Sequence, residues 1–213
     1  SFTLTEGNTF YSDRDFAATT LNYNRELSDN WLTVCLPFEY TIPEGVKVET
    51  LSEIDTETKT FTFNEVTGTM TANTPYIIKN STETAALFAS LSDASVKSTP
   101  EAMEVIVDGI DAEFVVTYTT KTSTELMEIT DDAAKYDILF FGTDGQLYYL
   151  SQGVTTKNIT FKPFRAYIRI PKGKINWTDG QQARVRHRNS EMTDIDTLES
   201  ANDSQKTTVI YDM

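Results

Sequence analysis

The fold class is decided by the stretch Phe140-Phe141-Gly142-Thr143-Asp144-Gly145-Gln146-Leu147-Tyr148-Tyr149. Two short apolar runs flank a segment with two glycines and an aspartate, which tolerate the backbone conformations of a tight turn. Apolar runs on both sides of such a turn are typical of a β-hairpin. The stretch therefore predicts two antiparallel strands joined at Asp144-Gly145.

Similar strand-like segments recur outward from this hairpin in both directions. Apolar and polar side chains alternate in segments 32–38, 46–48, 61–63, 105–107, 114–118, 138–141, 147–150, 159–161, 164–170 and 183–188. A period of two predicts half-buried strands, about ten in all. Helical patterns are confined to 82–91 and to a turn around Glu125, which are too short to cover a parallel sheet. We therefore expect an all-β, antiparallel β-sandwich with minimal helix, built as one sandwich or as two packed sub-sandwiches.

The composition agrees with a folded, acidic β-protein. Threonine, a β-branched residue that suits sheet surfaces, fills 34 of the 213 positions. The 18 basic and 32 acidic residues give a net charge of −14, so the whole chain repels nucleic acid and anionic lipid. No nucleic-acid partner is expected. No membrane insertion is expected either, because no apolar run is long enough to cross a bilayer.

The chain is expected to contain three segments. Residues 1–189 form the β-sandwich module, with a sub-boundary near 90–101 if there are two sub-sandwiches. Residues 190–206 are polar, acidic and almost free of aromatic side chains, which is typical of a linker. Residues 207–213 are expected to begin a further strand that is truncated.

The sequence has few of the residues that usually carry out catalysis or bind metal ions. The single cysteine, Cys35, lies in an apolar run and is expected to be a buried, unreactive thiol. The single histidine, His187, lies between Arg186 and Arg188, which disfavour its protonation and repel a metal ion. We therefore expect no catalytic residue, no metal site and no cofactor. A close carboxylate pair of the glycosidase type and calcium on scattered loop carboxylates remain open alternatives.

Four ordered motifs resemble a known family. They are the run from Asn30-Trp31 to Pro37-Phe38, the element Ala72-Asn73-Thr74-Pro75-Tyr76-Ile77-Ile78-Lys79, the hairpin 142–150, and Pro163-Phe164-Arg165-Ala166-Tyr167. Together they resemble a β-rich module of secreted and surface proteins of Bacteroides-type bacteria. The end of the chain, 209–213, is similar to the start of a surface-sorting tail but lacks its Gly-Arg. The resemblance implies an extracellular or outer-surface location and a non-catalytic role.

Basic residues are concentrated in one part of the chain. Residues 157–188 hold nine Lys and Arg side chains and one acidic residue. The candidate ligand-binding arginines lie on two expected strands: Arg165 and Arg169 on the first, and Arg184, Arg186 and Arg188 on the second. If these strands are neighbours, an arginine ladder forms. It would either face acidic strands of the same sheet or bind an acidic glycan, a lipopolysaccharide phosphate or an acidic partner domain.

Aromatic side chains near turns are a second set of candidate ligand-binding residues. Tyr148 and Tyr149 adjoin the hairpin turn, and Trp177 precedes Asp179-Gly180. An exposed aromatic platform there could stack on a sugar ring. Alternatively, the adjacent tyrosines point to opposite faces of their strand, so that one packs inside the protein and the other lies outside. Trp31, at the start of a strand, is expected to be a core anchor.

These observations lead to three hypotheses of function. The first is a non-catalytic, secreted or cell-surface module with an adhesive or accessory role in a larger surface protein, its partner a cell-surface glycan or another surface-protein domain. The second is a carbohydrate-binding module that uses the loop aromatics. A glycoside-processing enzyme is the distant third.

Overall fold

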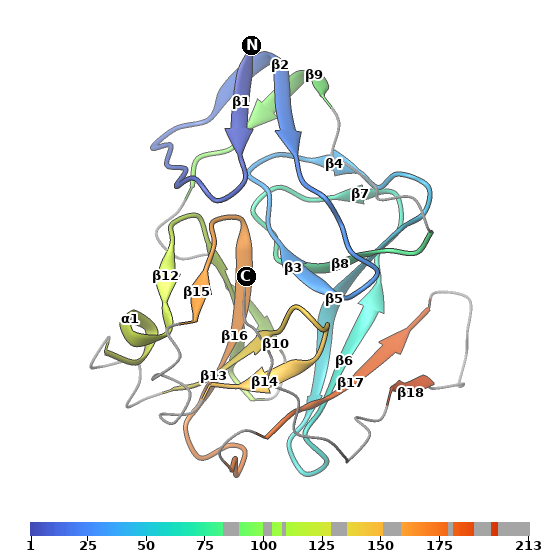
Figure 1. The fold of residues 1–213 in the computed structure, drawn as a ribbon, viewed down its shortest axis with the longest axis vertical. Coiled ribbons are helices and arrows are strands. Elements are labelled where there is room, and N and C mark those ends of the chain that lie inside the picture. The colour runs from blue at the N-terminus through green and yellow to red at the C-terminus, as the bar shows by residue number, and fades with distance from the viewer. Residues whose placement is uncertain are drawn as a thin grey trace.

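The protein is described here by a computed structural model covering residues 1–82, 90–99, 104–107, 110–128, 136–150, 159–178, 181–189 and 197–199. Strands make up most of these residues, and the only helix in them is the short α1 (Ser123–Glu128). The all-β class predicted from the sequence is therefore confirmed. Figure 1 shows a small sheet at the N-terminal end and two larger sheets below it.

Two large sheets form the body of the sandwich. The six-stranded sheet has the order β18-β17-β6-β5-β8-β3 and consists of β18 (Thr197–Glu199), β17 (Arg184–Arg188), β6 (Thr60–Glu65), β5 (Val46–Asp55), β8 (Tyr76–Asn80) and β3 (Leu32–Val34). The five-stranded sheet has the order β10-β11-β16-β13-β14 and consists of β10 (Glu104–Val107), β11 (Ala112–Thr117), β16 (Arg165–Pro171), β13 (Tyr136–Phe141) and β14 (Leu147–Tyr149).

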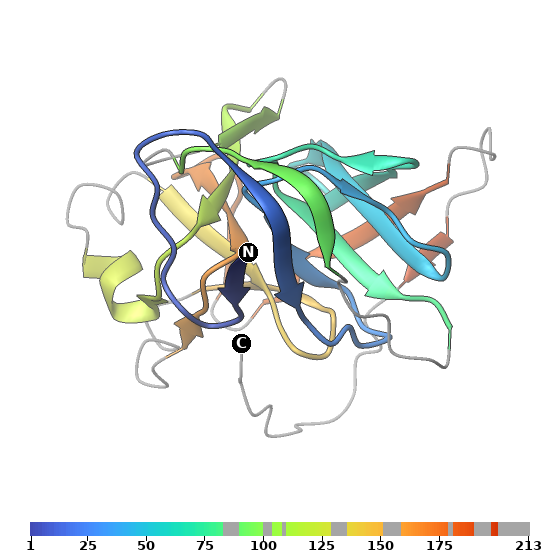
Figure 2. The ribbon, with the colours of Figure 1, turned by 90° about the horizontal axis from the view of Figure 1, so that it is seen from above.

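Three smaller sheets complete the fold. The N-terminal sheet, with the order β1-β2-β9, consists of β1 (Phe2–Thr5), β2 (Phe16–Asn24) and β9 (Leu91–Val96). The two short ribbons are β4 (Tyr40–Thr41) with β7 (Thr69–Met70), and β12 (Lys121–Thr122) with β15 (Thr160–Phe161). In Figure 2, α1 lies at one side of the molecule, and β17 and β18 lie at the opposite side.

The core between the two large sheets explains why these strands pair as they do. Phe61 and Phe63 of β6 pack with Phe114 of β11 and Phe141 of β13, all nearly or fully buried. The period of two is clearest in β16, where buried and half-buried residues alternate along the whole strand. Each such strand buries one face against the opposite sheet and leaves the other less buried, which defines a sandwich.

Two further clusters extend the core beyond the sandwich. One lies around β1, β2 and β3 and includes Tyr23, Phe38 and Phe164. The other covers the outer face of the five-stranded sheet, where Leu126 of α1 packs with Phe140 and Phe161. The chain therefore buries both faces of β13, in keeping with the continuous apolar run Ile138–Phe141 in its sequence.

Each of the ten segments predicted from the alternation contains a strand, and the turn around Glu125 is helical as expected. Most strand pairs are antiparallel, but β1 pairs with β2 and β17 pairs with β6 in parallel. The predicted antiparallel sandwich therefore also contains two parallel pairs. Both parallel pairs join segments that no tight turn connects, so their direction depends on longer connections than hairpin patterns describe.

Strands lie within two of the stretches where the sequence predicted a sub-boundary or a linker. Residues 91–96 of the predicted sub-boundary form β9, which pairs with β2, and residues 197–199 of the predicted linker form β18, which pairs with β17. Most of the predicted helix 82–91, the rest of the predicted linker 190–206 and all of 207–213 lie outside the described residues. The subdivision into two sub-sandwiches stays a prediction.

Candidate functional site

The turn of the β13–β14 hairpin packs directly on the chain that enters β3. Asn30 Nδ2 donates a hydrogen bond to the carbonyl oxygen of Thr143 at 3.0 Å. Gly145 has φ +77°, and a Cβ there would lie 2.9 Å from the backbone nitrogen of Trp31. Only glycine satisfies both the positive φ and this close approach without strain. The turn is thereby held against β3, and the two form adjoining walls of a pocket.

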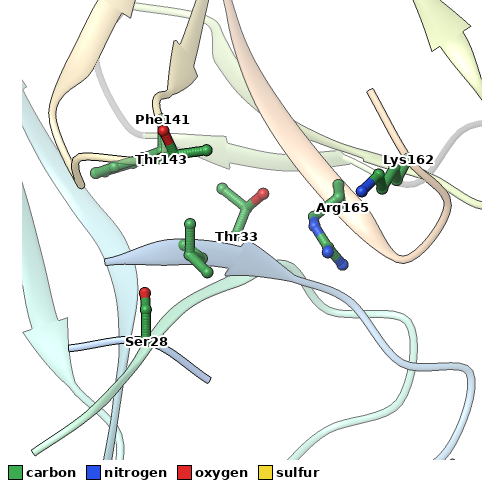
Figure 3. A pocket seen from close by; sticks show the side chains of 7 residues that line it. Ser28, Thr33, Phe141, Thr143, Lys162 and Arg165 are labelled. Atoms are coloured by element: carbon green, nitrogen blue, oxygen red, sulfur yellow. The ribbon is translucent and has the colours of Figure 1, made fainter. Parts of the chain in front are cut away.

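This pocket has a volume of about 220 Å³ and lies where β3, the hairpin turn and the start of β16 meet (Figure 3). Its lining residues are Ser28, Leu32, Thr33, Phe141, Thr143, Lys162 and Arg165. Two of these seven side chains are cationic, three carry hydroxyl groups, and none is acidic. Because Lys and Arg are pure donors and hydroxyls can donate as well, the lining suits an anionic group.

The two cations flank one tight turn at the start of β16. Phe164 has φ +64° and a fully buried ring, and its backbone nitrogen donates to the carbonyl oxygen of Thr117 at 2.8 Å. Its carbonyl oxygen accepts from the backbone nitrogen of Cys35 at 3.1 Å. The buried ring and these two bonds anchor the turn, and Lys162 and Arg165 flank it on the pocket side (Figure 3).

Arg165 belongs to a largely buried ionic cluster. Its Nη2 donates to the Glu6 carboxylate, which also accepts from the Tyr23 hydroxyl at 2.5 Å. Burial alone would raise the pKa of Glu6, but the charges of Arg165 and Arg25 and the hydrogen bonds from Tyr23 and Arg165 outweigh it and lower the pKa. Glu6 is therefore an anion near neutral pH.

A second arginine supports the wall of the pocket from behind. Arg25 is 4% exposed, and its Nη1 donates to the carbonyl oxygen of Thr33 at 3.1 Å. Burial and the nearby charge of Arg165 lower the pKa of Arg25 to about 10, so it remains cationic at neutral pH. The cluster thus holds two guanidinium groups against one carboxylate.

This imbalance leaves two buried donors without a hydrogen-bond acceptor among the described residues. They are Nη1 of Arg165 and Nη2 of Arg25. A buried donor without an acceptor costs about 1–3 kcal/mol, and more when it is charged. Arg165 Nη1 has almost no exposed surface, so an anion in the pocket could bond to it only if the guanidinium turned toward the pocket. A small carboxylate, sulfate or phosphate group would then supply the missing acceptor.

The structure brings only one of the predicted arginines to this pocket. Arg165 and Arg169 lie on β16, between β11 and β13 of the five-stranded sheet, whereas β17 belongs to the six-stranded sheet. A ladder joining the two strands was therefore wrong, because the core separates them. Arg169 instead forms an ion pair with Glu113, directly opposite on β11, and Arg188 with Glu53 at 3.3 Å. Arg184, Arg186 and Arg188 alternate with the buried Val185 as predicted, and Arg184 and Arg188 are exposed.

The candidate aromatic residues pack within the protein, away from the pocket. Tyr148 stacks with Phe140, and its hydroxyl donates to Asp144 at 2.5 Å. Tyr149 stacks with Trp177 on the other side of the strand, with ring centroids 5.3 Å apart and an interplanar angle of 10°. The adjacent tyrosines thus lie on opposite sides of the strand, as the alternative predicted, but both are half-buried and make internal contacts, whereas one of them was expected outside.

Six of the seven lining residues were not among the ligand-binding candidates predicted from the sequence: Ser28, Leu32, Thr33, Phe141, Thr143 and Lys162. The spacing of Lys162 and Arg165 around Pro163-Phe164 is the one local signal that points to them, because two cations flank a turn. Ser28 and Thr143 carry no such signal, since isolated hydroxyl residues are common in loops.

The single cysteine and the single histidine lie elsewhere. Cys35 is fully buried, as predicted, and burial raises the pKa of its thiol to about 12. His187 Nδ1 lies 2.6 Å from a Glu49 carboxylate oxygen, and its ring stacks on Trp31 with centroids 4.8 Å apart. Burial raises the pKa of Glu49 against the opposing effect of His187. Trp31 is 4% exposed, which confirms it as a core anchor.

The described residues contain neither a cluster of metal-ligating side chains nor a helix long enough to span a membrane. Within them, no group of three or more His, Cys, Asp or Glu side chains is placed to hold a metal ion. Their single helix, α1, is too short to cross a membrane. Comparisons with protein-family models, with curated proteins and with solved structures gave no match. The fold and the site together define an all-β protein with a cationic pocket at the edge of its sandwich.

Proposed function

We propose that this chain is a non-catalytic binding module of a bacterial surface protein, and that it holds an acidic group of a cell-surface glycan in the pocket beside β3. The observation that carries the proposal is the lining of that pocket. Lys162 and Arg165 face it together with three hydroxyl side chains, and Arg165 Nη1 lacks an acceptor. The extracellular location rests on the family resemblance of the motifs.

The volume of the pocket limits the size of the ligand that it can hold. A drug-sized ligand occupies a pocket of about 300–1,000 Å³, and this one measures about 220 Å³. It can enclose one charged sugar unit or its acidic substituent, but not a run of several sugars. The apolar side chains of Leu32 and Phe141 offer a surface for the C–H face of such a unit. We therefore favour a terminal uronic acid or a sulfated sugar.

The chemistry of the lining favours this ligand over a neutral sugar stacked on aromatics. Tyr149 and Trp177 are stacked on each other, and Tyr148 is engaged with Phe140 and Asp144. A neutral sugar would leave Arg165 Nη1 without a strong acceptor, whereas a carboxylate or a sulfate can accept from both cations. Binding should therefore weaken as salt is added.

The test is a titration of the protein with glucuronic acid by NMR, at low and at high salt. Lys162→Gln removes one pocket cation, and Lys174→Gln, an exposed lysine of the same basic region, makes the same charge change elsewhere. We expect Lys162→Gln to weaken binding about tenfold and Lys174→Gln to leave it unchanged. Failure of the wild type to bind glucuronic acid and sulfated monosaccharides would overturn the proposal.

A further inference from the structure

The pocket shares its arginine with a carboxylate from the N-terminus of the chain. Glu6 directly follows β1, and its carboxylate accepts from Arg165 Nη2, while Arg165 also lines the pocket. The two residues are 159 positions apart, so the contact exists only in the folded protein. A carboxylate is the same chemical group that a uronic acid would present.

Glu6 leaves part of Arg165 for another acceptor. Nη2 is bonded to Glu6, whereas Nη1 has no partner among the described residues. A guanidinium binds a carboxylate best through two parallel N–H donors. Because Nη1 is buried, an incoming anion could bond to it only if the guanidinium turned toward the pocket, and the anion could take both terminal nitrogens if Glu6 withdrew.

If Glu6 withdrew from Arg165, it would still have a positive charge nearby. The charge of Arg25 also acts on Glu6, and the Tyr23 hydroxyl donates to it at 2.5 Å. The side chain of Glu6 is 26% exposed, so water reaches part of it as well. These groups give the carboxylate an alternative set of partners once Arg165 turns to a ligand.

The strand that precedes Glu6 pairs with another strand on one side only. In the described residues β1 is the edge strand of the order β1-β2-β9 and pairs with β2 in parallel from Phe2↔Leu21 to Thr5↔Asn24. Leu4 anchors it in the core, with 4% of its surface exposed. Glu6 therefore lies between this edge strand and Phe10, whose backbone nitrogen donates to the carbonyl oxygen of Tyr118 at 2.9 Å.

We propose that Glu6 is an internal competitor of the anionic ligand, so that the contact of the β1 end with Arg165 sets the affinity of the pocket. The inference rests on the proposed function, because it assigns regulation to the same pocket. With Glu6 bound, the pocket presents Lys162 and one edge of Arg165. Without its charge, the whole guanidinium fork and the full positive potential act on the ligand.

The test compares two variants that each remove one negative charge. Glu6→Gln removes the competitor, and Asp15→Asn removes an exposed carboxylate that pairs with Lys97 at 2.9 Å, away from the pocket. Both are titrated with glucuronic acid at one fixed salt concentration. We expect Glu6→Gln to bind about tenfold more tightly than the wild type and Asp15→Asn to match the wild type.

If Glu6→Gln does not fold, a second variant and a measurement on the wild type still test the inference. Glu6→Asp keeps the charge but shortens its reach by one methylene, and we expect a smaller gain of about threefold. In the wild type, the carboxyl carbon resonance of Glu6 should shift when glucuronic acid is added. If the wild type binds and neither variant nor this resonance changes, the inference is overturned while the proposed function stands. If no form of the protein binds, the proposed function itself falls.

Discussion

Replacing Gly145 with alanine tests whether the hairpin turn is held against β3 as the structure shows. At φ +77° an alanine costs about 1–2 kcal/mol, because its Cβ crowds its own backbone. The new Cβ would also lie 2.9 Å from the Trp31 nitrogen and 3.3 Å from the Asn30 Cβ. Relieving that overlap requires a shift of the turn or of the chain entering β3, at a further cost of about 1–3 kcal/mol.

The matched control is Gly173→Ala. Gly173 has φ +83°, but a Cβ there would meet nothing within 4 Å, so only the backbone cost applies. For a domain of this size each kcal/mol lowers Tm by about 2–4 °C. We expect Gly145→Ala to lower Tm by about 6–12 °C and Gly173→Ala by about half of that or less.

The assay is thermal unfolding followed by circular dichroism, with both variants and the wild type in one buffer. Glucuronic acid binding is measured on the same samples, because a displaced turn moves Thr143 away from the pocket. Equal losses of Tm in the two glycine variants would refute the close packing of the turn on Trp31. So would a Gly145→Ala protein with unchanged Tm.

Three further predictions concern the core, the pH dependence and the thiol. Phe63→Ala, which removes a fully buried ring between the two large sheets, should lower the free energy of unfolding by about 3–5 kcal/mol in urea titrations, whereas Tyr11→Ala, at a 71% exposed position, should change it little. The lowered pKa of Glu6 means that its contribution to stability is present above pH 4.5 and is lost as the pH falls through its folded-state pKa. The raised pKa of Glu49 has the opposite sign, with stability present below pH 4.5 and lost as the pH rises through the folded-state pKa. The free energy of unfolding should therefore be measured from pH 3 to 7. Relative to the wild type, the loss of stability in Glu6→Gln should grow as the pH rises, and the loss in Glu49→Gln should shrink. Losses that do not change with pH would contradict both assignments. Cys35, with a pKa of about 12, should react with a thiol reagent at pH 8 only in denaturant, and rapid labelling of the native protein would show that the thiol is accessible.

Local patterns in the sequence were sufficient for many of the elements. The strand β16 alternates buried and half-buried residues, as its sequence predicted. The helix α1 begins after Thr122, whose hydroxyl accepts from the Glu125 backbone nitrogen at 3.1 Å while the Glu125 carboxylate accepts from the Thr122 backbone nitrogen at 2.6 Å. Such a reciprocal cap depends only on residues three positions apart, so the sequence contains it in full.

Strands with weak local signals were missed. The strand β2, Phe16–Asn24, is rich in small and polar residues, and β9, Leu91–Val96, contains Ser92, Asp93 and Ser95. They are strands because they pair with each other and because Leu21 and Val96 are fully buried. Propensity for strands depends strongly on such partners, so a sequence window that excludes the partner cannot show it.

The period of two along the chain was enough to establish an all-β protein, because side-chain direction alternates in any strand regardless of its partner. Which strands become neighbours is a different matter, decided by the burial of apolar faces across the whole chain. The packing of the strands placed Arg165 beside Glu6 and kept Arg165 apart from the arginines of β17. It also brought Thr143 within bonding distance of Asn30, 113 positions away. The pocket therefore belongs to the tertiary structure alone, since its cations and hydroxyls meet only after the sheets have packed.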